Sequence, residues 1–542
     1  MTAAPVKSWQ DLKAAKKAEQ DARIPEEWRL KAADLPSQDV ADLRSIAQRC
    51  GILSDDELEI TGDRYDATSL ATAIADGKYS AVEVVTAFCK RAAVGHQLCN
   101  MLTEIMFADA IEQAKKLDEI FKSTGKPVGP LHGVPMTFKE CFHFKGYDST
   151  NGYLSRVFQP ATTTTPLAQL MQAAGAVIIS KTNVPQTMLV AEADNNVFGQ
   201  TRNPVNCNLT CGGSSGGEGA VQAFRGSALG VGTDVGGSVR IPAAANGVYG
   251  YKPSFGIIPM IGYSYSGWTG SNTGIPAVTG PLGHSVRDLA LFTRIVRESH
   301  PWRFDPSVIA NIMEIEVSSR KPVVGVLYQS GLTPHPPIRR GLQEAVEKLK
   351  SAGFDVREFT APNFLDIREI TEQLFTLDGL SYPKQELQKT GEPVVNSVQQ
   401  IGFWDIPRKT QEEAWAWNTK KLAIQKQMLD EWQRVGCDVV LAPAGPHTAV
   451  RPGDWTSDIY TVAWNAVDYP AVIIPTSHVD PSKDPLDGEF RAMHDADAKN
   501  QATYDPELFK GAPIALQIVG PRLADAQLLK DADMIDKVIN CH

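Results

Sequence analysis

Short apolar runs recur along the chain and alternate with segments of helical period. Each run is rich in Val, Ile or Leu, and the runs comprise residues 133–138, 176–179, 228–232, 323–327, 439–441 and 472–474. Because a run that is apolar at consecutive positions buries both faces of a strand, these strands belong to a covered sheet. Intervening segments such as 339–353 have the spacing of amphipathic helices. The pattern predicts the α/β class, with helices on both sides of the sheet.

Capping residues mark where helices begin. Ser8 with Asp11, and Ser80 with Glu83, have the spacing that satisfies the first backbone N–H groups of a helix. A further helix is predicted over residues 107–121, where glycine and proline follow its end. These signals predict three helices in the first quarter of the chain.

The chain is predicted to be one large domain with an arm. Residues 1–65 are predicted to form an N-terminal helical arm packed on the core, because their pattern is helical and polar. No linker divides the remainder, so residues 66–542 are predicted to form a single domain. The polar run 480–510, rich in Asp, Pro and Lys, is predicted to be a surface excursion.

Composition and charge limit the kinds of partner that we expect the protein to bind. The chain of 542 residues is 43% hydrophobic and carries 53 Lys and Arg against 63 Asp and Glu, a net charge of −10. Because a negative surface does not neutralise phosphates or bind anionic lipid, we expect no nucleic-acid or membrane partner. No apolar stretch of membrane-spanning length occurs, and the eight cysteines are scattered, as in proteins of reducing compartments. We therefore expect a cytoplasmic protein without a signal peptide or membrane anchor.

Two clusters of glycine and serine carry the chemical signal. The first is Gly-Gly-Ser-Ser-Gly-Gly over 212–217, and the second is Thr-Asp-Val-Gly-Gly-Ser over 233–238. Glycine lets backbone N–H groups approach a ligand closely, and successive N–H groups form a concavity for developing negative charge. Ser238 ends the second turn, so it is placed to attack a carbonyl whose oxygen lies among the N–H groups of residues 235–238.

Other interpretations of the clusters are weaker, although one stays open. Plain glycine turns do not require two long clusters so close in sequence, and a Walker phosphate loop needs a lysine that neither cluster contains. Residues 213–217 fit the G-x-S-x-G motif of α/β-hydrolases, but the polar segment before them is not a strand. A Ser-His-Asp mechanism remains possible, since histidines follow at positions 284, 300, 335, 447, 478, 494 and 542.

Lys139 is the candidate base if no histidine serves. It directly follows the apolar run 133–138, at the end of the predicted strand. A solvated lysine stays protonated near neutral pH, whereas burial disfavours the ammonium and can lower the lysine pKa by roughly 3 units or more. A lysine at a strand end is usually a solvated tip, so Lys139 is a candidate only because the serine clusters accompany it.

Taken together, these motifs resemble the amidase signature family. Residues 212–217 and 233–243 match its defining stretch without a departure, and the resemblance covers most of the chain, including 133–139, 181–186, 280–282 and 513–520. Residues 51–54 and 87–91 look most like fungal acetamidase-type general amidases. Residues 184–188 and 198–201 also resemble fatty acid amide hydrolases, although the N-terminal membrane helix of those enzymes is not expected here.

The resemblance implies both a fold and a catalytic triad. The fold would be a single α/β/α domain around a large mixed, twisted sheet, in a homodimer. Ser238 would be the nucleophile that forms the acyl-enzyme, and Ser214 would be a bridging serine that follows a cis peptide bond. Lys139 would be the neutral base that takes the proton through Ser214 and returns it to the leaving amine.

The resemblance also implies the residues around the triad. Backbone N–H groups of Val235, Gly236, Gly237 and Ser238 would hold the oxyanion, and Met188 would contact the substrate. Asp234 and Arg240 are interpreted as supports of this loop. No cofactor is expected, whether metal, nucleotide or flavin, and the pair Cys207 and Cys211 lacks a second Cys or His pair at metal-ligand spacing.

The predicted function is hydrolysis of a small carboxylic amide to the acid and ammonia or amine. Two alternatives stay open: an amidotransferase subunit that passes ammonia to a partner, and a non-catalytic amide-binding protein. The acetamidase-like N-terminal segments disfavour the first, and the intact Lys139, Ser214 and Ser238 disfavour the second. Tyr263, Tyr265 and Trp268 either line a pocket for the acyl group or pack in the core.

Overall fold

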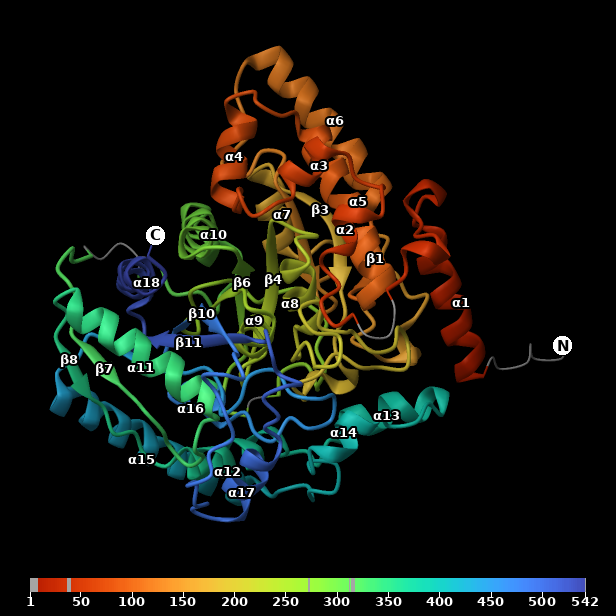
Figure 1. The fold of residues 1–542 in the computed structure, drawn as a ribbon. Coiled ribbons are helices and arrows are strands. Elements are labelled where there is room, and N and C mark those ends of the chain that lie inside the picture. The colour runs from red at the N-terminus through yellow and green to blue at the C-terminus, as the bar shows by residue number, and fades with distance from the viewer. Residues whose placement is uncertain (1–7, 37–39, 272, 311, 313–316, 542) are drawn as a thin grey trace, which may run out of the picture.

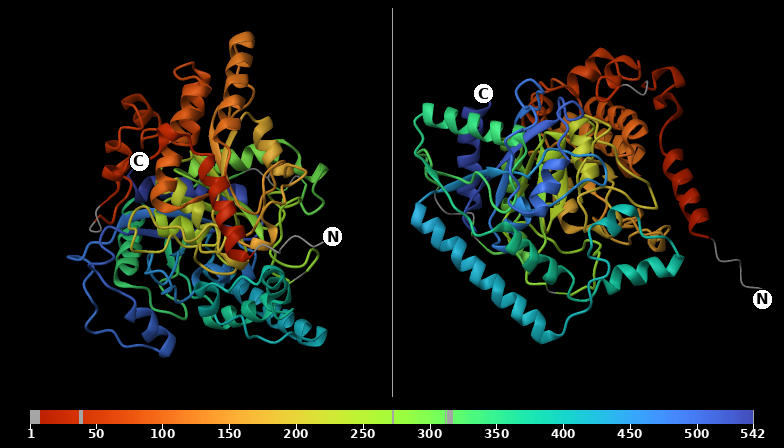
Figure 2. Two further views of the ribbon diagram at one scale, coloured as in Figure 1. Left: turned by 90° about the vertical axis from the view of Figure 1, so that its right-hand side faces the viewer. Right: turned by 60° about the horizontal axis from the view of Figure 1, so that its bottom comes forward.

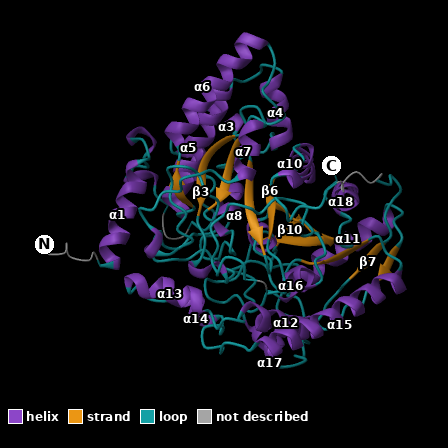
Figure 3. Ribbon diagram, turned by 180° about the vertical axis from the view of Figure 1, so that it is seen from behind, coloured by secondary structure: helices purple, strands orange, loops and turns teal. Residues whose placement is uncertain are grey.

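A single mixed sheet of 11 strands runs through the protein, with helices on both of its faces (Figures 1 and 3). The computed structural model describes residues 8–36, 40–271, 273–310, 312 and 317–541. In sheet order the strands are β1 (Leu102–Ile105), β3 (Val177–Thr182), β2 (Pro135–Lys139), β4 (Leu229–Asp234), β6 (Val278–Gly283), β5 (Tyr249–Lys252), β10 (Ala471–His478), β11 (Pro513–Val519), β9 (Val439–Pro443), β7 (Val324–Val326) and β8 (Val356–Glu358). The α/β class and the mixed sheet predicted from the sequence are confirmed.

The helices cover the sheet because their apolar faces pack against strands that are apolar on both sides. In the described part of the chain, no helix is both long and apolar enough to cross a bilayer. The helices are α1 (Trp9–Ala22), α2 (Ile46–Arg49), α3 (Asp55–Ile60), α4 (Ala67–Ala75), α5 (Ala81–Cys99), α6 (Phe107–Thr124), α7 (Pro166–Ala173), α8 (Gly216–Ala223), α9 (Arg240–Asn246), α10 (Val286–Glu298), α11 (Pro336–Ser351), α12 (Phe364–Phe375), α13 (Ser381–Thr390), α14 (Asn396–Gln400), α15 (Gln411–Val435), α16 (Ile459–Ala466), α17 (Asp495–Ala502) and α18 (Asp525–Ile539).

The predicted helix ends are confirmed. Ser8 and Ser80 each accept a hydrogen bond from the N–H group three residues on, and a carboxylate returns a bond to the backbone N–H of the capping serine. Gly125 ends α6 in the left-handed conformation, with φ +66°. Local hydrogen bonding therefore fixes these boundaries.

Strand direction brings three polar strand ends to one edge of the sheet. β2 pairs in parallel with β3 and with β4, so the carboxyl ends of these strands point the same way. Lys139 ends β2, Thr182 ends β3 and Asp234 ends β4. This is the edge at which α/β folds bind their ligands.

Helix α1 lies against the edge strand of the sheet, β1 (Figure 1). The Gln20 amide donates hydrogen bonds of 2.8 and 2.9 Å to the carbonyls of Leu102 and Thr103. The buried Lys16 ammonium lies 2.6 Å from Glu104 and 2.7 Å from Asp148. These contacts satisfy polar groups that an edge strand otherwise leaves open.

The prediction that residues 480–510 are a surface excursion is wrong in part. Asp484, Asp497 and Phe509 in this segment are fully buried, and α17 lies within it. Arg340 on α11 donates a 2.7 Å hydrogen bond to Asp484, and the backbone N–H of Thr333 donates one of 2.7 Å to Asp497. The acidic residues that make the segment look exposed are instead partners for buried donors.

Candidate active site

Lys139 is fully buried at the carboxyl end of β2 and points at the first serine cluster. Its ammonium nitrogen lies 2.7 Å from the Ser214 Oγ and 2.8 Å from the Thr233 Oγ1. Both partners are hydroxyls, so neither supplies the negative charge that would hold a proton on the amine. This arrangement suits an amine that acts as a base.

Burial lowers the pKa of Lys139 to about 8, because desolvation disfavours its ammonium. A carboxyl group nearby, Glu218, accepts hydrogen bonds of 2.8 Å from Thr137 and from Thr182. Burial raises the pKa of Glu218 to about 8, so this carboxyl is largely protonated near neutral pH. Asp234 and Glu218 favour the ammonium of Lys139, but desolvation outweighs them, so the pKa of the lysine is lowered overall.

Ser214 is held by a tight turn that precedes α8. The Gly213–Ser214 peptide bond is cis, and the N–H of Ser215 donates a 3.1 Å hydrogen bond to the Ser238 carbonyl. Gly213 lies against the backbone of Glu192, and a Cβ at this position would meet the Glu192 carbonyl oxygen at 2.0 Å. Only glycine fits here, so the predicted Gly-Gly-Ser pattern has a direct steric reason.

Ser238 lies in the turn between β4 and α9, beside the Ser214 turn. Its hydroxyl makes no hydrogen bond to another described residue, and its side chain borders two cavities. Among the four predicted oxyanion donors, the N–H of Gly237 donates a 2.9 Å hydrogen bond to Asp234. The N–H groups of Val235, Gly236 and Ser238 have no acceptor within the part of the chain that the structure describes. Three of the four are therefore available to a substrate oxygen.

Asp234 and Arg240 lie where supports of the loop were expected. The fully buried Asp234 carboxylate accepts 3.0 Å hydrogen bonds from Arg240 Nε and Nη2 and a 2.9 Å bond from Asn465. The Arg240 guanidinium holds the pKa of Asp234 well below its usual range. A buried bidentate pair is rigid, so it fixes the turn that carries Ser238.

Sequence reasoning missed Thr233 and Glu218 as neighbours of the lysine. Thr233 lies within the second cluster and Glu218 directly follows the first, but their roles depend on the pairing of β2 with β3 and β4. The histidine alternative finds no support, because none of the histidines between 284 and 494 lines either cavity at Ser238. The last candidate, His542, lies outside the described residues.

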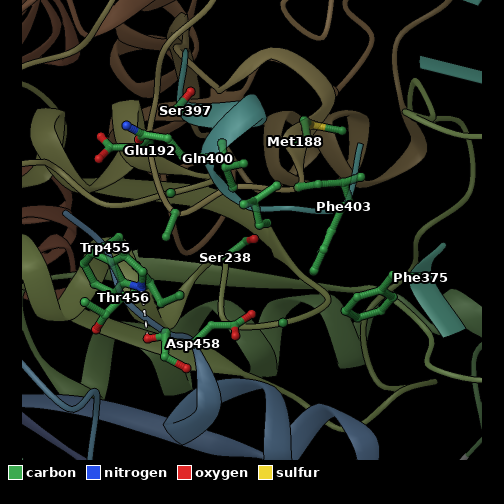
Figure 4. A pocket seen from close by; sticks show the side chains of 18 of the residues that line it. Met188, Glu192, Ser238, Phe375, Ser397, Gln400, Phe403, Trp455, Thr456 and Asp458 are labelled. Carbon is green, nitrogen blue, oxygen red and sulfur yellow. Dashed lines mark hydrogen bonds between the residues drawn. The ribbon is translucent and has the colours of Figure 1, made fainter. Parts of the chain in front are cut away.

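The two cavities meet at Ser238, Met188 and Phe375. The smaller cavity, of about 190 Å³, is bordered by Glu192, Trp455 and Asp458 as well (Figure 4). The larger cavity, of about 750 Å³, is lined by the aromatic residues predicted from the sequence, Tyr263, Tyr265 and Trp268. These three residues therefore line a cavity, which the sequence left undecided.

Met188 reaches both cavities because the segment after β3 turns sharply. Thr187 and Met188 have φ values of +74° and +57°, which are unusual for residues with a side chain. Each such residue costs of the order of 1–3 kcal/mol, and strain of this kind is concentrated at functional sites. The cost is compatible with the substrate-contacting position expected for Met188.

Comparison with known proteins supports the same assignment. The family model described as Amidase matches residues 83–529. An acetamidase of Aspergillus oryzae is 36% identical over 553 residues, which cover 99% of each chain. An acetamidase of Emericella nidulans is 36% identical over 547 residues, which cover 98% of each chain.

Solved structures show the same fold. The structure of a fatty acid amide hydrolase matches with a TM-score of 0.91 at 30% identity, covering 98% of this chain and 95% of that one. A bacterial aryl acylamidase matches with a TM-score of 0.69 at 21% identity, covering 88% and 96%, which shows the fold alone. The chain belongs to the amidase signature family and is a hydrolase that cleaves amide bonds.

Proposed function

We propose that this protein hydrolyses small carboxylic amides to the acid and ammonia or amine, through an acyl-enzyme on Ser238. Lys139, Ser214 and Ser238 form the catalytic triad. The observation that carries the proposal is the buried Lys139 amine, 2.7 Å from the Ser214 Oγ and without a carboxylate partner. A buried lysine whose hydrogen-bond partners are only hydroxyls has a lowered pKa, so its neutral amine can act as a general base.

Acylation begins with transfer of two protons. The Ser238 hydroxyl gives its proton to Ser214 as the Ser214 proton moves to the Lys139 amine, and the Ser238 Oγ bonds to the amide carbon. The carbonyl electrons move onto the oxygen, which the N–H groups of Val235, Gly236 and Ser238 stabilise. Each such donor contributes roughly 3 kcal/mol to lowering the barrier. The C–N bond then breaks, and the nitrogen takes a proton from Ser214, which recovers one from Lys139.

Deacylation repeats the route with water as nucleophile. Water gives its proton through Ser214 to Lys139 as its oxygen bonds to the acyl carbon, and the Ser238 Oγ leaves with a returned proton. The products are the carboxylic acid and the free enzyme. The residues supply every proton transfer in both halves of the reaction.

The test is release of ammonia from a panel of primary amides, from acetamide to benzamide and oleamide. We expect release by the wild type and none by Ser238→Ala. A folded wild-type protein that releases nothing from any member contradicts the proposal. Trapping of a Ser238-bound acyl group by mass spectrometry separates the acyl-enzyme route from direct attack by water.

We further propose that the protein is a homodimer that pairs through α15. This helix of 25 residues lies along the outer edge of the molecule (Figure 2). Trp415, Leu422 and Leu429 follow one another at intervals of seven residues on its outer side and are 59%, 62% and 43% exposed. Residues one heptad apart lie on the same face of a helix, so these three form an exposed apolar stripe that we call the seam.

The seam fits a second copy of the same helix in antiparallel orientation. Trp415 and Leu429 are equidistant from Leu422, so a twofold axis there stacks Leu422 on its copy and Trp415 on Leu429.

Two properties of the whole chain are proposed as well. A cytoplasmic location is supported by eight cysteines that are all free thiols. An N-terminal arm of residues 1–65, packed on an amidase signature domain of 66–542, is supported by the contacts of α1 with β1 through Lys16 and Gln20. Fractionation tests the location, and limited proteolysis near residue 65 tests the division.

A further inference from the structure

The two cavities at Ser238 differ in which catalytic groups they contain. Gly213 and Gly236 border the smaller cavity only, whereas Ser214 and Thr233 border the larger cavity only. Ser238 borders both, so an amide bound at Ser238 extends into each of them. The catalytic groups on either side decide which half of the amide lies where.

Proton transfer fixes the orientation of the amide. In the mechanism proposed above, Ser214 delivers a proton to the leaving nitrogen, so that nitrogen and its substituent face Ser214. Because Ser214 borders the larger cavity, the amine portion lies there. The oxygen lies near the N–H of Gly236, and the acyl substituent extends into the smaller cavity that Gly236 borders.

The smaller cavity limits the size of the acyl group. Its volume of about 190 Å³ compares with the roughly 150 Å³ cavity that holds a benzene molecule. Arg368 and Asp458 lie 3.2 Å apart at its wall, and the carboxyl of Glu192, buried to 4% exposure, borders it as well. Figure 4 shows Glu192 and Asp458 on opposite sides of Ser238. Apolar side chains such as Phe375 and Phe403 line the cavity as well, so its volume, and not a lack of apolar partners, is what excludes a long acyl chain.

The larger cavity is wider and carries a cluster of aromatic side chains. Its volume is about 750 Å³, and Tyr263 and Tyr265 pack together at its wall, with ring centroids 4.2 Å apart and ring planes tilted by 39°. The Trp268 ring packs edge-on against Tyr382 at 5.0 Å, and its indole N–H donates a 3.1 Å hydrogen bond to Ser381. Aromatic walls held in place in this way suit a large aromatic substituent.

We propose that the preferred substrates are secondary amides in which a compact acyl group is joined to an amine that carries a bulky aromatic ring. The smaller cavity takes an acyl group up to about the size of one ring, and the larger cavity takes the amine. The inference rests on the proposed amidase function and adds the assignment of each cavity. It places selectivity in the leaving group and not in the acyl group.

Two isomeric amides test this assignment. N-(2-naphthylmethyl)acetamide carries the ring on nitrogen, and N-methyl-2-(2-naphthyl)acetamide carries the same ring on the acyl side. The leaving amines are both alkylamines, so their intrinsic reactivity is similar. We expect kcat/KM for the first isomer to exceed that for the second by roughly tenfold or more. The naphthyl ring of the first isomer fills the larger cavity, whereas the ring of the second isomer is too large for the smaller cavity.

Variants locate the preference. Trp268→Ala removes part of the larger cavity's wall, so the ratio of kcat/KM between the isomers falls by about threefold or more. Trp302→Ala is the matched control, because Trp302 borders neither cavity, and the ratio stays as in the wild type. An unchanged ratio in Trp268→Ala overturns the assignment of the amine to the larger cavity.

The outcomes separate this inference from the proposed function. Equal rates for the isomers, or a preference for the ring on the acyl side, overturn the inference while hydrolysis itself upholds the amidase. Cleavage of acetamide with no cleavage of either isomer also overturns the inference and leaves the amidase standing. If acetamide, N-methylacetamide and both isomers all remain intact, the result contradicts the proposed amidase function itself, and the inference about the cavities falls with it.

Discussion

Lys139 and Ser214 are separated by 75 positions in the sequence, yet the Lys139 Nζ lies 2.7 Å from the Ser214 Oγ. β2 carries the lysine, and the turn before α8 carries the serine. Neither segment is catalytic alone, because a solvated lysine keeps its proton and a lone serine has no base.

Replacing either serine is expected to abolish most of the activity, by different routes. Ser238→Ala removes the nucleophile, and Ser214→Ala interrupts proton transfer to Lys139. Residues that act as one unit have non-additive effects, so each variant and the double variant should lose about 1,000-fold or more in kcat. Single-turnover kinetics of all three variants provide the measurement. A double variant far below both single variants would show that the serines act independently.

Activity is expected to rise with pH. The pKa of Lys139 is lowered to about 8, and the neutral amine, which is the active form, becomes dominant above that value. Below it, kcat/KM should fall by about tenfold per pH unit as the amine is protonated. A pH profile with acetamide as substrate measures the effect. A profile that stays flat down to about pH 5 rules out the lysine base.

The same shift in pKa predicts how stability depends on pH. Unfolding returns Lys139 from a pKa of about 8 to its ordinary value of 10.5, so between these values the unfolded state binds more protons. The free energy of unfolding therefore gains from this residue as pH rises from about 8 to 10.5 and loses that gain as pH falls through 8. Compared with Lys139→Met, the wild type should gain roughly 3 kcal/mol across this window. Urea unfolding of both proteins at pH 7 and 10 measures the difference, and parallel curves would contradict it.

The glycines beside Ser238 are expected to differ in tolerance. Gly237 has φ +130°, and a Cβ there would meet the Thr461 Oγ1 at 2.3 Å. Gly236 has no such φ, and its nearest contact would be 3.6 Å. Gly237→Ala should therefore lower kcat/KM by about 100-fold or more, because it moves the oxyanion donors, whereas Gly236→Ala should cost less than about tenfold. Equal losses in both variants would show that neither the positive φ nor the crowding at Gly237 controls the turn.

Dimerisation through α15 is expected to depend on its exposed seam. Leu422→Glu places two carboxylates against each other at the proposed twofold axis, so the protein should sediment as a monomer at concentrations where the wild type is a dimer. Leu486→Glu is the matched control, because Leu486 is 65% exposed but lies far from α15 in the sequence. A Leu422→Glu protein that stays dimeric places the interface elsewhere, and a monomeric wild type removes the dimer altogether.

Local sequence rules predicted the features that depend on neighbouring residues. The caps at Ser8 and Ser80 are confirmed because their hydrogen bonds span only three residues. The sheet strands are confirmed because apolar runs report burial directly. The segment 480–510 was wrong in part because its acidic residues find distant partners, such as Arg340 for Asp484, that no local pattern contains.

The sequence by itself determined which chemical groups are present: a lysine at the end of an apolar strand, two serines in glycine turns, and an α/β chain to carry them. Only the tertiary structure decided what these groups do together. The parallel pairing of β2 with β3 and β4 encloses Lys139, adds Thr233 and Glu218 around it, and lowers its pKa. It also sets which cavity each catalytic group borders. A pKa depends on desolvation and a cavity on packing, and both arise from contacts between segments that are far apart in the chain.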